Sequence, residues 1–171
     1  MIRMKSELMD VVNERDEVVD IASQGDVYQK NLPHRIVHVL LFNEAGEMAL
    51  QLRSKTKSFC PSHWSTAVGG HVQSGESYEQ AALREMKEEI GIILPLNFAF
   101  KDWYSGIAHP SLNKFLATFT AHYGGALEVN PEEVEKVEFF SLAEIKQMLA
   151  RGEKFHPELV FLLEKHFFKI S

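Results

Sequence analysis

Apolar and polar residues follow one another in short runs, which predicts a protein built largely from short strands. A polar turn at 13–17 separates two such runs, at 9–12 and 18–19. Further runs of strand character lie at 36–42, 48–52, 65–68, 98–104, 114–121 and 138–140. The segment Asn43-Glu44-Ala45-Gly46 predicts a turn, so the first two of these further runs form a hairpin.

One segment, residues 77–90, has the pattern of an amphipathic helix. Its apolar residues recur at helical spacing and form one stripe, made of Ala82, Leu83, Met86 and Ile90. Ser77 with Gln80 three positions later fits a capping box at the start of the helix. Gly91 stands where a glycine commonly ends a helix, so both ends of this helix are predicted by local sequence.

The order of the elements predicts a mixed α/β chain without a regular βαβ alternation. Two closing helices are expected at 142–150 and 158–168. A length of 171 residues favours one domain over 1–171. Within it, residues 1–31 form an N-terminal hairpin extension and residues 142–171 contribute the closing helices.

The composition of the chain argues against several classes of partner and location. The formal net charge is −6, which makes the chain a poor candidate for non-specific binding of nucleic-acid polymers, since that binding needs a basic footprint. Cys60 is the single cysteine, so no intrachain disulfide forms, which fits a reducing compartment. The first ten residues lack the apolar core of a secretory signal, and no apolar run reaches the length of a membrane span. We therefore expect a cytoplasmic protein with neither a membrane nor a nucleic acid as partner.

Three carboxylates stand out on the predicted helix. Glu85, Glu88 and Glu89 occupy positions i, i+3 and i+4, which places them on one side of the helix as surface neighbours. Such charges repel one another, and a divalent cation such as Mg²⁺ removes that cost. The preceding Gly69-Gly70 pair allows a backbone carbonyl to reach the same cation. A solvated acidic helix face is the alternative interpretation.

Residues 70–92 resemble the Nudix box, Gly-x5-Glu-x7-Arg-Glu-U-x-Glu-Glu-x-Gly-U, where U is a bulky aliphatic residue. Every fixed position is filled, by Gly70, Glu76, Arg84, Glu85, Glu88, Glu89 and Gly91. The aliphatic positions hold Met86 and Ile92. The resemblance implies an α/β/α sandwich with a mixed central sheet, in which the box forms a loop, a helix and a loop.

The resemblance also implies an activity, the hydrolysis of a diphosphate linked to another moiety, with Mg²⁺ or Mn²⁺ as cofactor. It makes Glu88 and Glu89 metal ligands, Glu85 a ligand or base, and Gly70 a backbone ligand. Arg84 would orient a glutamate by an ion pair, and Glu76 would have an outer, structural role. A further glutamate often comes from a later loop, where Glu133 is favoured over Glu132 and Glu135. A solvated acidic loop explains those three equally well.

Several residues outside the box are candidate substrate contacts. Arg53, Lys55 and Lys57 could hold a terminal phosphate, or they form a solvated basic loop. His71 with His34 could bind a phosphate or a second metal, although ordinary hydrogen-bonded histidines are the simpler reading. An aromatic loop could stack a nucleobase, although core packing explains its aromatics equally well; its residues are Trp103, Tyr104 and His109.

Flanking segments are similar to the Nudix branch that includes isopentenyl-diphosphate isomerase; they are 13–17, 32–35, 51–54 and Trp64 before the box. The isomerase's catalytic cysteine position holds Gly69 here, and its later glutamates fall on Leu112 and Lys114. A hydrolase acting on a nucleoside-diphosphate derivative or related organic diphosphate is therefore favoured. An isomerase and a non-catalytic ligand-sensing module are the alternatives. Family analogy adds a homodimer as a candidate assembly, and the substrate stays open.

Overall fold

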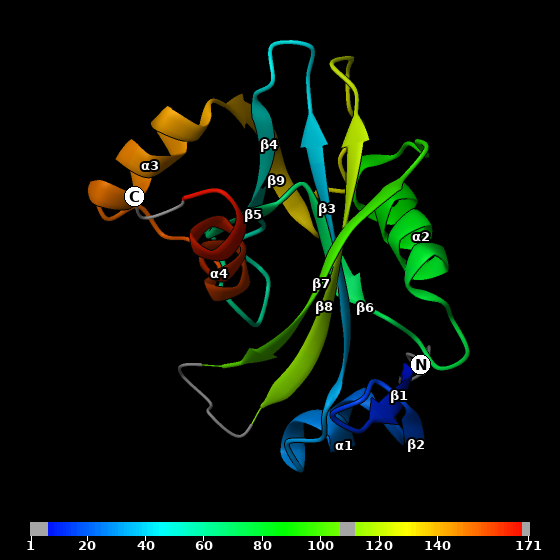
Figure 1. The fold of residues 1–171 in the computed structure, drawn as a ribbon. Coiled ribbons are helices and arrows are strands. Elements are labelled where there is room, and N and C mark those ends of the chain that lie inside the picture. The colour runs from blue at the N-terminus through cyan, green and yellow to red at the C-terminus, as the bar shows by residue number, and fades with distance from the viewer. Residues whose placement is uncertain (1–6, 107–111, 169–171) are drawn as a thin grey trace.

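The computed structural model describes residues 7–106 and 112–168 (Figure 1). Its elements in chain order are β1 (Leu8–Val12), β2 (Val18–Ser23), α1 (Gln24–Gln29), β3 (His34–Phe42), β4 (Met48–Arg53), β5 (Trp64–Thr66), β6 (Val68–His71), α2 (Tyr78–Ile90), β7 (Asn97–Ser105), β8 (Asn113–His122), β9 (Val134–Phe140), α3 (Leu142–Ala150) and α4 (Pro157–His166). None of the helices in these ranges combines the length and the apolar character that crossing a membrane requires.

A seven-stranded sheet forms the centre of the molecule, with the order β5-β4-β3-β8-β7. Strand β6 pairs with β3, and β9 pairs with β4. The β3–β8 pair is parallel and the other pairs are antiparallel, so the sheet is mixed as expected. Strands β1 and β2 form a separate two-stranded sheet, the N-terminal hairpin.

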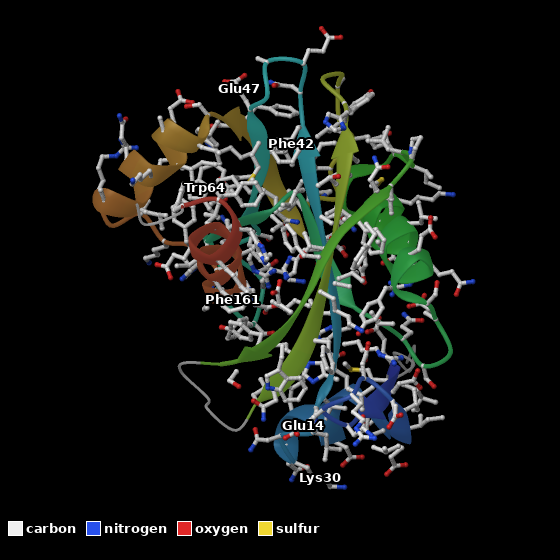
Figure 2. All side chains as sticks on the ribbon, viewed as in Figure 1. Glu14, Lys30, Phe42, Glu47, Trp64 and Phe161 are labelled. Carbon is white, nitrogen blue, oxygen red and sulfur yellow. The ribbon has the colours of Figure 1, made fainter. Side chains whose placement is uncertain are left out.

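Helices cover both faces of the sheet, which confirms the predicted sandwich (Figures 1 and 2). Successive side chains of β3 point to opposite faces, because the side-chain period of a strand is two residues. Val37 and Val39 pack beneath α2, whereas Leu40 packs against α3 and α4. A strand buried on both faces reads as a continuous apolar run, as β3 does.

Helix α2 begins and ends where the local sequence predicts. The Ser77 hydroxyl accepts a hydrogen bond from the Gln80 backbone N–H, and the Gln80 side chain accepts one from the Ser77 N–H. Gly91 has φ of 74° in the left-handed region. A Cβ there would also lie 2.7 Å from the Glu128 carbonyl oxygen, so only glycine allows residue 128 to pack on this helix end.

The single strand expected at 65–68 is two strands. Strand β5 pairs with β4 and β6 pairs with β3, because β3 and β4 pair directly only at Phe42 and Met48 and then separate. The chain crosses that gap at Ala67. Strand β9 also begins earlier than expected, at Val134, and the short helix α1 was not predicted. The bounds of these strands depend on which strand from a distant part of the sequence pairs with each of them.

Buried charged groups lie on the α4 face of the sheet. The Lys114 ammonium is 3.2 Å from one oxygen of Glu158, and the His38 Nε2 is 3.1 Å from the other. Burial opposes ionisation of Glu158, but Lys114 and His38 outweigh it and hold the pKa of that carboxyl well below its usual range. Burial also lowers the pKa of His156 and of His34 to about 4 each.

These shifts predict acid sensitivity of the fold. Between about pH 8 and 4.5 two sets of shifts oppose each other. Protons excluded from His34 and His156 lower the stability as the pH falls, whereas protons held by Glu85 and Glu89, whose pKa is raised to about 7 and about 8, increase it. Below about pH 4.5 the unfolded chain protonates Glu158 while the folded protein keeps it charged, so stability falls as the pH falls. We expect urea denaturation to give a free energy of unfolding about 1.5 kcal/mol lower at pH 3 than at pH 4.5. A value that stays constant across this range would contradict the assignment.

Candidate functional site

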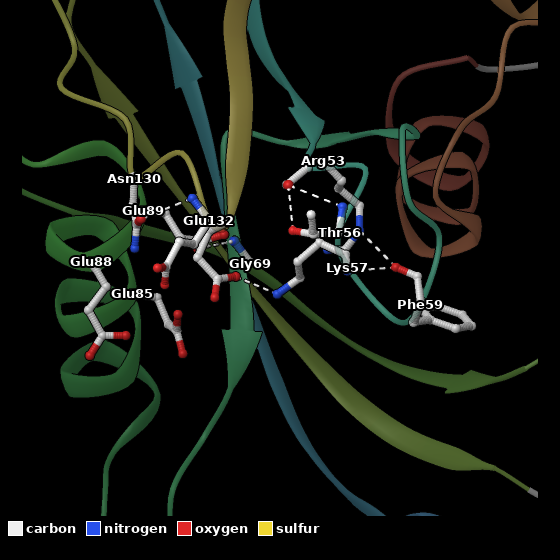
Figure 3. A network of polar contacts seen from close by, with 12 residues as sticks. Arg53, Thr56, Lys57, Phe59, Gly69, Glu85, Glu88, Glu89, Asn130 and Glu132 are labelled. Atoms are coloured by element: carbon white, nitrogen blue, oxygen red, sulfur yellow. Dashed lines mark hydrogen bonds and ion pairs between the residues drawn. The ribbon is translucent and has the colours of Figure 1, made fainter. Parts of the chain in front are cut away.

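The glutamates of α2 meet the backbone of β6 at one edge of the sheet (Figure 3). A Cβ on Gly70 would lie 2.3 Å from the carboxyl carbon of Glu85, so the Glu85 side chain occupies the space that glycine leaves open. The Gly69 backbone N–H donates to Glu89 Oε2 at 3.1 Å. The two glycines thus let two carboxylates rest directly on the strand.

Glu89 is buried, with 5% of its surface exposed, although the sequence placed all three glutamates on the helix surface. Its second oxygen accepts a hydrogen bond of 3.0 Å from Gln51 Nε2 on β4. Burial and the neighbouring charge of Glu85 raise the pKa of Glu89 to about 8 against those hydrogen bonds. Glu89 points inward because the side of α2 that carries it packs against the edge of the sheet.

Glu85 and Glu88 complete the group. Burial raises the pKa of Glu85 to about 7, with a hydrogen bond from Arg84 opposing the shift and the charge of Glu88 adding to it. The Glu88 side chain is 56% exposed and lies 3.4 Å from Arg84 Nη1. The three carboxylates therefore span the range from buried to solvent-facing along one edge of α2.

Arg84 links several parts of the box through hydrogen bonds. Its Nε donates to Glu76 at 2.6 Å, its Nη1 to Glu85 at 2.8 Å, and its Nη2 to the His71 carbonyl at 3.0 Å. The carboxylate of Glu76 also accepts from the Gln73 backbone N–H. Ion pairs with Glu76 and Glu85 raise the pKa of the guanidinium above its usual value despite its burial. Arg84 thus ties the loop before α2 to the helix and fixes the direction of Glu85.

Glu133 reaches the site from the loop between β8 and β9. The Asn130 N–H donates to the Glu89 carbonyl at 3.1 Å, which fastens this loop to α2. The charge of Glu133 contributes to the raised pKa of Glu89. Its own side chain forms an ion pair with Lys57. Glu133 is half-buried, whereas the other two candidates, Glu132 and Glu135, are exposed.

Arg53, a predicted phosphate contact, makes hydrogen bonds within its own loop. Its Nε donates to the carbonyls of Phe59 and Cys60 at 3.2 Å each, and its Nη2 donates to Phe59 at 2.8 Å. These bonds close the loop that contains two left-handed non-glycine residues, Cys60 with φ of 48° and Ser62 with φ of 56°. The guanidinium therefore stabilises the loop, whereas Lys55 on the same loop is exposed.

His71 and His34 lie on the face of β6 and β3 that is turned away from α2. The Tyr28 hydroxyl bonds to Nε2 of His71, and the rings of His34 and His71 lie 5.9 Å apart. Burial lowers the pKa of His71 to about 3. His34 donates from Nδ1 to the Leu32 carbonyl at 3.0 Å. Tyr28 was missed from the sequence because it belongs to the unpredicted helix α1.

Core packing accounts for the two described aromatics of the candidate stacking loop. Tyr104 is buried against Phe161 with ring centroids 5.1 Å apart. Trp103 packs edge-on to Phe115 at 4.9 Å. His109, the third member, lies outside the described residues.

The donors at the sheet edge suit a hard divalent cation. Within residues 7–106 and 112–168, no three acidic, imidazole or thiol side chains already form a compact ligand set. The charge of Glu88 nevertheless raises the pKa of Glu85, and the charge of Glu85 raises the pKa of the buried Glu89, which indicates an excess of negative charge. Carboxylate oxygens are the donors that Mg²⁺ and Mn²⁺ accept, and a cation relieves the repulsion.

Replacing Gly70 by alanine is expected to displace Glu85, because the new Cβ overlaps its carboxyl group. Shifting a group of the site by about 1 Å costs on the order of 100-fold in rate. The affinity of Gly70→Ala for added Mn²⁺, and any catalysis at these carboxylates, should therefore both fall. Gly25→Ala is the matched control, since only Ser23 Oγ, at 3.9 Å, approaches its Cβ. Unchanged Mn²⁺ affinity in Gly70→Ala would contradict the predicted overlap.

Comparison with known proteins places these features in a family. A NUDIX domain model matches residues 32–163. A Nudix hydrolase of Streptomyces coelicolor is 37% identical over 149 residues, covering 86% of this chain and 81% of the relative. A Nudix hydrolase of Deinococcus radiodurans is 30% identical over 163 residues, covering 95% of each chain. The crystal structure of DR0079 from Deinococcus radiodurans superposes with a TM-score of 0.82 at 29% identity, covering 95% of this chain and 100% of that one.

A relative of another activity also matches. The protein named isopentenyl-diphosphate Delta-isomerase 2 of Photorhabdus laumondii is 26% identical over 145 residues, covering 84% of this chain and 82% of the relative.

Proposed function

The chain belongs to the Nudix family and is a Nudix-type hydrolase, and we propose that it catalyses metal-dependent hydrolysis of a nucleoside-diphosphate derivative or a related organic diphosphate. One observation carries this proposal. The complete box places Glu85 and Glu89 against the glycine backbone of β6, where their repulsion favours a bound cation.

Each residue of the site has a proposed role in that reaction. Glu85, Glu88 and Glu89 would hold Mg²⁺ or Mn²⁺, together with the Gly70 carbonyl. The metal, when bound, would neutralise phosphate oxygens and activate water. Arg84 orients Glu85, which acts as a ligand or as the base, through their 2.8 Å ion pair.

The chemical balance is simple. The oxygen of water forms a bond to phosphorus, and the bond from that phosphorus to the bridging oxygen breaks. A proton of the water passes to a carboxylate, and two phosphate-bearing products leave. The chain supplies positioning and charge stabilisation, which carry most of the catalysis in phosphoryl transfer.

The isomerase relative supports isomerisation as a second candidate function. Residue 69, which corresponds to the catalytic cysteine of the isomerase, opposes it. Gly69 replaces the cysteine, and a Cβ there would lie only 3.1 Å from His38 Nδ1 and 3.4 Å from Thr66 Oγ1. The nearby Lys114 ammonium already pairs with Glu158. Residue 69 therefore supplies no thiol, and hydrolysis remains the proposed reaction.

A screen for the release of phosphate-bearing fragments tests the proposal. The two products are resolved by ion-exchange chromatography, because cleavage of a nucleotide sugar or a dinucleotide at its diphosphate frees no inorganic phosphate. The panel contains nucleoside triphosphates, nucleotide sugars, dinucleotides, coenzyme derivatives and isoprenoid diphosphates, each with Mg²⁺, Mn²⁺ or EDTA. We expect release from at least one class, abolished by EDTA. No release by folded protein that binds Mn²⁺ would favour a ligand-sensing module. Conversion of isopentenyl diphosphate without phosphate release would establish the isomerase instead.

A further inference from the structure

Lys57 and Glu133 form an ion pair between two loops that are far apart in the sequence. Both loops are held in place by bonds that do not involve this pair. Arg53 closes the loop of Lys57, and the Ser54 N–H donates to the Glu133 carbonyl at 3.1 Å. The backbones are therefore fixed, and the two side chains meet as movable groups between them.

Glu133 stands beside the proposed metal site. The loop that carries it is fastened to the end of α2, where the Glu128 N–H donates to the Ile90 carbonyl and the Asn130 N–H to the Glu89 carbonyl. Its negative charge acts on Glu89. Lys57 therefore brings an ammonium to the rim of a cluster of carboxylates, whereas Arg53 is committed to its own loop.

The ion pair is well suited to exchange. The side chains of Lys57 and Glu133 are 27% and 41% exposed, and pairs in such surroundings contribute only about 0–1 kcal/mol. A divalent cation offers Glu133 a stronger partner than an ammonium does. A diphosphate offers Lys57 several anionic oxygens, and a flexible lysine binds phosphate as a point charge.

We propose that Lys57 is a substrate ligand that exchanges Glu133 for a phosphate of the diphosphate when metal and substrate bind. This inference rests on the proposed function, because it assumes a metal at the glutamates of α2. The exchange gives Lys57 opposite effects on the binding of metal and of substrate. It competes with the metal for Glu133 in the absence of substrate, and it holds the phosphate once substrate arrives.

Because Lys57 competes with the metal for Glu133, removing Lys57 should strengthen metal binding while it weakens phosphate binding. Calorimetry would measure Mn²⁺ binding to the protein alone, and imidodiphosphate binding in the presence of Mg²⁺. In Lys57→Met the dissociation constant for Mn²⁺ should fall about three- to fivefold, the equivalent of an exposed ion pair. The dissociation constant for imidodiphosphate should rise about tenfold, because a charge-assisted contact is lost.

Further variants separate exchange from a structural effect. Lys57→Arg keeps the charge and should restore imidodiphosphate binding to within about twofold. In a Glu133→Gln background, Lys57→Met should no longer tighten Mn²⁺ binding, because the contested carboxylate is gone. Lys30→Met is the control. It removes a lysine from another exposed ion pair, with Asp26, in the N-terminal part of the chain.

Three results would overturn the exchange. They are weaker or unchanged Mn²⁺ binding in Lys57→Met, tightening that persists in the Glu133→Gln background, and unchanged imidodiphosphate affinity in Lys57→Met. If the wild-type protein binds no Mn²⁺, the proposed metal-dependent function itself fails. If it binds Mn²⁺ and hydrolyses diphosphates while Lys57→Met behaves as wild type, only the role of Lys57 is wrong.

Discussion

Replacing Glu88 by glutamine is expected to lower kcat/KM for diphosphate hydrolysis by about 1,000-fold or more, the equivalent of about 4 kcal/mol of transition-state stabilisation. Glutamine keeps the shape of the side chain but removes the negative charge that would bind the metal. The Glu88 side chain is 56% exposed and touches Arg84 only at 3.4 Å, so the fold should be retained. The measurement is steady-state kinetics with the substrate found by screening, alongside thermal unfolding.

A matched control lies on the same helix. Glu79→Gln makes the same chemical change at an exposed position in the first turn of α2 and should leave kcat/KM unchanged. Equal activity of Glu88→Gln and Glu79→Gln would remove Glu88 from the mechanism. Loss of activity together with loss of folding would contradict the expected separation of function from stability at this site.

Replacing Glu158 by glutamine is expected to destabilise the protein by about 3–5 kcal/mol. The Glu158 carboxylate is buried between Lys114 at 3.2 Å and His38 at 3.1 Å. Removing its charge leaves the ammonium of Lys114 buried without its partner, and that penalty exceeds the energy of the lost contact. Urea denaturation at pH 7.5 measures the effect as a change in the free energy of unfolding.

The double variant Lys114→Met/Glu158→Gln tests the reason for that loss. Removing both charges should recover most of the stability, because no uncompensated charge is then left buried. Glu164→Gln, at an exposed position on the same helix α4, is the control and should change stability by less than about 0.5 kcal/mol. A loss in the double variant as large as in Glu158→Gln would contradict this account.

The sequence alone determined the features that depend on neighbours within a few residues. Helix α2 and helix α3 appear where they were expected, since side-chain caps and apolar periodicity act over three or four positions. The box residues were readable for the same reason, because their spacing is fixed along one helix and its flanking loops. The order of the runs predicted a mixed α/β chain, and the resemblance to the Nudix family added the mixed sheet.

Tertiary structure decided the features that depend on distant partners. Glu89 is buried because α2 meets the sheet edge at Gly69, and β5 and β6 separate because β3 and β4 diverge. The loop contacts of Arg53 also could not be predicted, because they depend on the path that brings the carbonyls of residues 59 and 60 to its guanidinium. Lys57 and Glu133 meet across 76 positions, and no local pattern specifies such a contact, because the paths of two loops bring them together.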